Sequence, residues 1–115
     1  MTITETLNGS ITVLAIDGTL DASSAPELLK CTAITNTSNS IVIDLEHVDF
    51  LDSSGLGALV NISRRKKELN ANTLLCCMSP RIRKVFEITN AYRLFPIFDE
   101  RGAAVEYASQ QTSST

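Results

Sequence analysis

The sequence predicts an α/β fold in which one mixed five-stranded sheet packs against about four helices, in the order β-β-α-β-α-β-α-β-α. Runs rich in β-branched residues alternate with runs of helical periodicity, which is typical of a mostly parallel sheet. Asn8-Gly9 separates two short β-rich runs, a strong hairpin signal. Residues 41–45 are almost wholly apolar, as in a strand that is covered on both faces.

Local signals place the first elements. Hairpin strands are expected at Ile3–Leu7 and Ile11–Ile16, which makes the sheet antiparallel at its N-terminal edge and parallel afterwards. Ser24 and Glu27 have the spacing of a capping box. They predict a helix from Ala25 to Thr35.

The remaining elements show the same alternation. Apolar side chains on one side of Leu56–Asn70 predict a helix, and we expect the stem of Lys66, which falls on that side, to reach toward solvent. Ser79-Pro80 is typical of a helix N-cap followed by proline at the first helical position. The order is completed by strands at Thr73–Met78 and Pro96–Phe98 and by a terminal helix at Glu100–Ala108.

Composition restricts the class of protein. The 115 residues are 43% hydrophobic and 20% charged, which suits a single domain; we expect it to span residues 1–108, with residues 109–115 disordered. No run resembles a membrane span or a signal peptide, so we expect a cytoplasmic protein without membrane association. A net charge of -3 does not suggest a nucleic-acid partner. We expect a monomer.

The cysteines do not predict a metal site. Cys31, Cys76 and Cys77 are odd in number and lack CxxC spacing, which argues against a metal centre or a disulfide framework and favours buried or nearly buried thiols. No phosphate-binding loop ending in Gly-Lys is present. We therefore expect no metal, no cofactor and no resident ATP chemistry.

The most informative segment is residues 48–57, which joins a buried strand to the next helix. Sites in such sheets gather beyond the carboxyl ends of the strands. An acid followed by two serines can cap the helix, but capping alone does not explain Gly55 and Gly57 in its first turn. A helix start without large side chains would let another surface approach closely.

This segment resembles the signature of STAS domains of the anti-sigma-factor antagonist type. The resemblance lies in Asp52-Ser53-Ser54-Gly55-Leu56-Gly57, which follows Val48-Asp49-Phe50-Leu51, and it extends over about residues 8–107. Gly18-Thr19-Leu20-Asp21 and Ser79-Pro80 match in the right order.

The resemblance implies a regulator rather than an enzyme. It implies that Ser53 is the acceptor for a partner that is both anti-sigma factor and serine kinase, that the unmodified form binds this partner and releases a sigma factor, and that a serine phosphatase resets the modified form. The implied partner-binding residues are Asp21, Asp52, Ser53, Ser54, Gly55, Leu56 and Gly57. An alternative keeps the fold: a STAS scaffold or switch protein whose partner controls something other than a sigma factor.

Physical chemistry supports a switch at Ser53. A phosphate adds about -1.5 to -2 charges, and a helix N-terminus favours an anion. Asp49 and Asp52 already make the segment acidic, with no basic residue to offset them. A partner fitted to the hydroxyl would therefore meet repulsion.

Two other classes fit less well. A hydrolase would use Ser53 in a nucleophile elbow, but Leu51 replaces the first glycine of that motif and no histidine follows the serine; we expect His47 in a loop. A phospho-receiver domain could use Asp52, but the first strand region ends in the lone acid Asp17 and no lysine follows Lys84.

Overall fold

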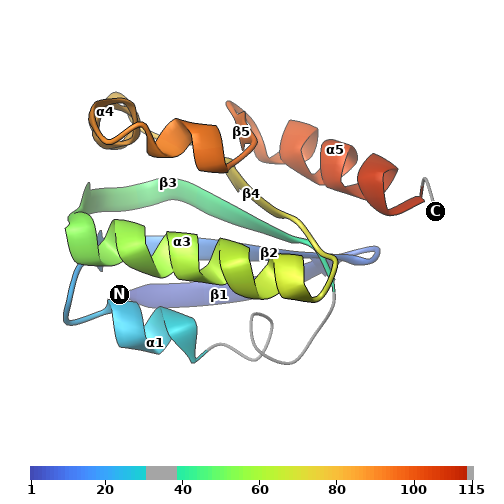
Figure 1. The fold of residues 1–115 in the computed structure, drawn as a ribbon, viewed down its shortest axis with the longest axis horizontal. Helices are drawn as coiled ribbons and strands as arrows, with labels where there is room; N and C mark the ends of the chain where they lie inside the picture. The colour runs from blue at the N-terminus through green and yellow to red at the C-terminus, as the bar shows by residue number, and fades with distance from the viewer. Residues whose placement is uncertain (31–38, 114–115) are drawn as a thin grey trace.

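Within residues 1–30 and 39–113, which the computed structural model describes, five strands form one sheet whose spatial order follows the sequence (Figure 1). The first pair is antiparallel and the later pairs are parallel. The strands are β1 (Thr2–Asn8), β2 (Ile11–Leu20), β3 (Ile41–Leu51), β4 (Thr73–Cys76) and β5 (Ile97–Phe98). The α/β fold predicted from the sequence is confirmed.

The predicted hairpin forms at the N-terminus. Asn8 pairs with Ile11, so Gly9 and Ser10 make the turn. Gly9 has φ +65, a left-handed conformation that a residue without Cβ adopts at little cost. The asparagine of the Asn-Gly signal thus ends β1.

The helices differ from the prediction at their ends. They are α1 (Ala25–Leu29), α3 (Ser53–Glu68), α4 (Pro80–Ile88) and α5 (Arg101–Ser113), with a 3₁₀ helix at Ala91–Leu94. The predicted continuation of the first helix to Thr35, together with Cys31, falls on residues 31–38, which lie outside the described part of the chain. α3 begins three residues before the expected Leu56, and α5 continues past Ala108.

Each face of the sheet carries its own apolar cluster. Side chains alternate across a strand, so Leu14 and Ile43 pack toward α1, α3 and α4, whereas Val13 and Val42 pack toward α5. Figure 1 shows α1 and α3 side by side and α5 apart from both. The helices contribute Leu28 (α1), Leu59 and Ile62 (α3), Phe86 (α4), and Ala104 and Ala108 (α5). Two layers of helix therefore enclose the sheet.

Lys66 corrects one expectation. The whole residue is 0% exposed, so its stem does not reach solvent. The reason is helical spacing: Lys66 lies one turn beyond Ile62 on the buried side of α3. Burial lowers the pKa of its ammonium group.

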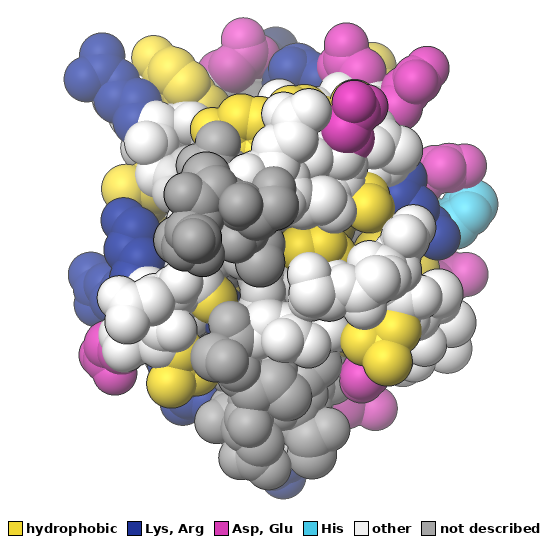
Figure 2. Space-filling view, turned by 90° about the vertical axis from the view of Figure 1, so that its right-hand side faces the viewer, with side chains coloured by type: hydrophobic (Ala, Val, Ile, Leu, Met, Phe, Trp, Pro, Cys, Tyr) yellow, Lys and Arg dark blue, Asp and Glu magenta, His cyan; other side chains and the backbone are white. Residues whose placement is uncertain are grey.

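The surface carries mixed charge. Figure 2 shows Lys and Arg side chains interspersed with Asp and Glu around the margin of one face. Among the described residues, no helix has the length and apolar character that crossing a membrane would need.

Candidate functional site

The ends of β2 and β3 bring the predicted site residues to one edge of the sheet. Leu20 and Leu51 are register partners at the end of this parallel pair, so Asp21 and Asp52 follow at the same edge. The Asp52 amide donates a hydrogen bond to the Leu20 carbonyl at 3.3 Å. The loops that follow the two strands are therefore adjacent.

Asp52 starts α3 as its N-cap. Its backbone is extended (φ -105, ψ -173), and its carboxylate accepts a hydrogen bond from the Gly55 amide at 2.9 Å. This cap moves the start of the helix to Ser53, so Ser53 and Ser54 occupy its first turn rather than a preceding loop. Both serines are exposed. Their amides are among the first four of the helix, which have no intrahelical acceptor.

The two glycines have different roles. A Cβ on Gly55 would stand 2.2 Å from the Leu20 carbonyl oxygen, so only glycine lets α3 approach β2 this closely. A Cβ on Gly57 would meet nothing within 4 Å, and Gly57 is exposed. The small size of Gly55 serves packing within this chain, whereas Gly57 leaves open space on the surface.

Asp21 organises the turn after β2. Its carboxylate accepts hydrogen bonds from the Ser23 amide at 3.0 Å, the Ser23 hydroxyl at 2.6 Å and the Ser24 amide at 3.2 Å. The hydrogen bond from the Ser23 hydroxyl is the main cause that lowers the pKa of Asp21 below its usual value. The residue is partly exposed.

The predicted capping box is wrong. The Ser24 side chain makes no cap hydrogen bond to α1. Its hydroxyl instead donates to the Thr19 carbonyl at 2.8 Å and accepts from the Asp21 amide at 3.0 Å. Ser24 is thus used to close the turn that carries Asp21, a role that depends on the conformation of the preceding strand.

β3 reaches the site as a strand, which the sequence pattern did not predict. The pairing with β2 continues to Leu51, so His47 is an exposed strand residue and not part of a loop. Phe50, 49% exposed, lies next to this edge, as does Asp49, which accepts a hydrogen bond from the Thr19 hydroxyl at 3.1 Å. Regular strand alternation would put Phe50 on the same face as the buried Val48. The exposure of Phe50 follows instead from an irregularity in the β2–β3 pairing, which passes from Gly18–Val48 to Thr19–Phe50, and no local sequence signal marks it.

Residues 3–104 match the STAS domain family, so the chain belongs to it. Among relatives, an anti-sigma-B factor antagonist of Listeria monocytogenes is 29% identical over 89 residues, which are 76% of this chain and 78% of that protein. These matches assign the chain to a family whose named relatives include anti-sigma factor antagonists.

Solved structures show the same fold. A crystal structure of an anti-sigma factor antagonist from Mycobacterium paratuberculosis has a TM-score of 0.85 at 24% identity, covering 94% of this chain and 93% of that one. The anti-sigma factor antagonist SpoIIAA in its unphosphorylated form has a TM-score of 0.79 at 20% identity, covering 95% and 97%. The Bacillus protein SpoIIAA in its phosphorylated form has a TM-score of 0.69 at 20% identity, covering 92% and 98%.

Proposed function

We propose that this chain is an anti-sigma-factor antagonist controlled by phosphorylation of Ser53. The unmodified protein binds an anti-sigma factor that is also a serine kinase, and this binding releases a sigma factor. Phosphorylation ends the binding, and a serine phosphatase restores it. In this proposal the chain regulates by docking and performs no catalysis of its own.

The exposed Ser53 hydroxyl at the first position of α3 carries the proposal. A kinase can reach this side chain without opening the apolar core, because the residue lies outside both clusters. The adjoining surface comprises Asp21, Asp52, Ser54, Leu56 and Gly57, with Gly55 holding α3 in place. Phosphorylated SpoIIAA, which shares the fold, supports the idea that such a domain tolerates the modification.

Electrostatics explains why one phosphate would act as a switch. The free amides and the dipole at the start of α3 favour the added anion, so the domain itself is not expected to unfold. Asp21, Asp49 and Asp52 already make this edge acidic. A partner surface fitted to the neutral hydroxyl would face juxtaposed like charge, which costs several kcal/mol.

The test begins with capture of the partner by an immobilised Ser53→Ala chain from the cytosol of the source cell. The captured protein must transfer phosphate from ATP to the purified wild-type chain, with mass spectrometry mapping the phosphate to Ser53. It must also bind a sigma factor in competition with the unmodified chain. Phosphate on another residue, or none, would contradict the switch at Ser53.

The same experiment separates the alternative output. A kinase that modifies Ser53 but holds no sigma factor would identify a partner-switch protein with another target. The surface that recognises the kinase would then be as proposed, and only the regulated process would differ.

A further inference from the structure

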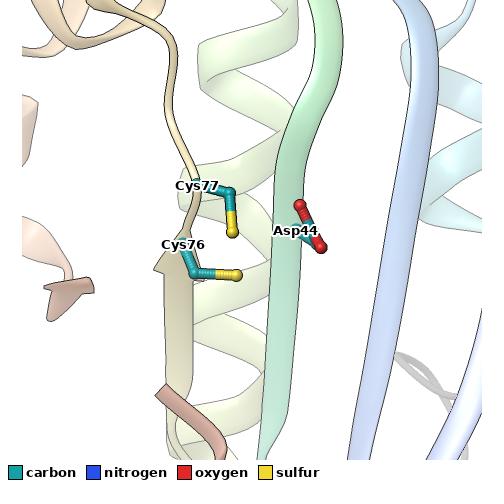
Figure 3. A group of neighbouring side chains, drawn as sticks. All are labelled: Asp44, Cys76 and Cys77. Carbon is teal, nitrogen blue, oxygen red and sulfur yellow. The ribbon is translucent and has the colours of Figure 1, made fainter. Parts of the chain in front are cut away.

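A carboxylate and two thiols converge where β4 ends. Asp44 of β3 is the register partner of Cys76, the last residue of β4, and Cys77 follows directly. A carboxylate oxygen of Asp44 and the two sulfur atoms all lie within 4.8 Å of one another. Figure 3 shows both sulfur atoms directed toward the strand that carries Asp44.

The backbone at Cys77 makes this convergence possible. Successive side chains of a strand point to opposite faces, so adjacent cysteines in a regular strand would not share a site. Cys77 has φ 62, a left-handed conformation that is unfavourable for a residue with a Cβ. Its amide donates to the Phe98 carbonyl at 3.1 Å, which anchors this conformation to β5. The turn brings its thiol to the side of Cys76.

Arg101 currently provides the positive charge beside Asp44. The Asp44 side chain is 5% exposed, and one of its oxygens accepts hydrogen bonds from Arg101 Nη2 at 2.6 Å and Nε at 2.8 Å. The other oxygen accepts from the Glu46 amide at 2.9 Å. Arg101 is the first residue of α5, and its side chain is 46% exposed. The guanidinium group can therefore move toward solvent without disturbing the core.

A hollow beside the cluster gives a cation access to it. Carboxylates outnumber guanidinium groups along its lining, so the hollow attracts positive ions. The lining residues are Asp44, Glu46, Cys77, Met78, Asp99, Glu100 and Arg101. Asp99 also accepts a hydrogen bond from Arg83 at 2.9 Å. The positive charge of Arg83 therefore offsets the negative charge of Asp99 but not that of the other lining carboxylates.

We propose that Asp44, Cys76 and Cys77 form a binding site for a thiophilic divalent cation of the zinc class. Zinc binds sulfur at about 2.3 Å, which puts two sulfur ligands about 3.8 Å apart in a tetrahedral site. Small side-chain rotations bring the observed cluster into this range. The remaining coordination position faces the hollow, where water or a lining carboxylate can fill it.

The chemistry selects the class of ion. Both thiols lose their protons to solvent as their sulfur atoms bond to the cation. Because the cation must displace both protons, only an ion that bonds strongly to thiolate can occupy the site. Magnesium and calcium ions prefer six or more oxygen ligands and do not fit. The spacing of the cysteines in the sequence does not predict this site, because Asp44 comes from a neighbouring strand.

Cobalt(II) titration of the reduced full chain tests the site. A Cys31→Ser background leaves Cys76 and Cys77 as the only thiols. We expect one Co²⁺ per chain with a thiolate-to-metal charge-transfer band that Zn²⁺ abolishes by displacement. Cys77→Gly suits the left-handed backbone and should preserve the fold, while it lowers Zn²⁺ affinity by more than about a hundredfold, since even outer contacts of metal sites contribute about 10–100-fold. A band that is absent, or equal affinity in Cys77→Gly, would overturn the site.

A pair of arginine variants tests the competition for Asp44. Arg101→Gln should strengthen Zn²⁺ binding several-fold because the cation no longer displaces a guanidinium group. Arg93→Gln is the matched control, since Arg93 lies over the Tyr92 ring and does not line the hollow, so its loss should leave affinity unchanged. Thermal unfolding of each variant checks that the fold is intact. Unchanged or weaker binding in Arg101→Gln would refute the assigned competition.

Discussion

The carbonyl oxygen of Leu20 lies 2.2 Å from the position that a Cβ on Gly55 would take. This contact sets the distance between the end of β2 and the first turn of α3. Because the Asp52 amide bonds to the same carbonyl, one backbone group of Leu20 holds the cap and the helix start together. The exposed serines are positioned by this packing, not by their own side chains.

Gly55→Ala should destabilise the protein by about 1–3 kcal/mol, the usual cost of forcing extra volume into a packed site. The new methyl group would push α3 away from the rigid Leu20 carbonyl. Urea unfolding at neutral pH measures the change. Gly57→Ala is the matched control: its methyl meets no atom, and the free energy of unfolding should stay the same or rise by up to about 1 kcal/mol. Equal stability of the two variants would contradict the packing role of Gly55.

Ser53→Asp should weaken binding to the captured kinase by about a hundredfold or more, whereas Ser53→Ala should preserve it. Each 1.4 kcal/mol of repulsion is a factor of ten in affinity. Titration calorimetry with the purified partner measures both. Ser109→Asp adds the same charge to an exposed position on α5, on the opposite face of the sheet from α3, and should leave affinity unchanged. The switch fails if Ser53→Asp binds as tightly as Ser53→Ala.

Asp52→Ala should lower the free energy of unfolding by about 1 kcal/mol, because the Gly55 amide loses its N-cap acceptor. Asp52→Asn keeps an oxygen acceptor and should stay close to wild type. Comparing the two by urea unfolding separates the cap from the charge of the carboxylate. If Asp52→Asn is as unstable as Asp52→Ala, the stabilisation comes from charge and not from the cap.

Asp21 should stabilise the folded protein at pH values above 3.8, the ordinary pKa of its carboxyl group. This contribution should be lost as the pH falls through the lower pKa that Asp21 has in the folded state. The sign follows because the unfolded chain binds the proton more readily than the folded one. The stability gap between wild type and Asp21→Asn should therefore be larger at neutral pH than in acid. Because the group is exposed to solvent, we expect a small effect.

A nuclear magnetic resonance titration of the Asp21 carboxyl group tests whether the hydrogen bond from Ser23 lowers its pKa. Ser23→Ala removes the shortest of the hydrogen bonds that this carboxylate accepts, and it should move the pKa of Asp21 back toward 3.8. A pKa that stays unchanged in Ser23→Ala would assign the shift to another cause.

Much of the fold could be predicted because its signals are local. Asn8-Gly9 marks the hairpin, and Ser79 caps α4 as expected, accepting from the Ile82 amide at 3.3 Å. The capping box at Ser24 failed because the hydroxyl oxygen accepts from a different donor, the Asp21 amide, whose position depends on how β2 ends. A sequence pattern cannot rank two donors that the fold brings within reach of one oxygen.

The amino-acid sequence by itself determined the order of strands and helices and the segment that carries Ser53, since periodicity, caps and turns act over a few neighbouring residues. Only the tertiary structure decided that Gly55 packs on Leu20, that Lys66 is buried, and that Asp44 meets two adjacent thiols. These relationships join residues far apart in the chain, and they depend on strand register and on the approach of a helix to the sheet.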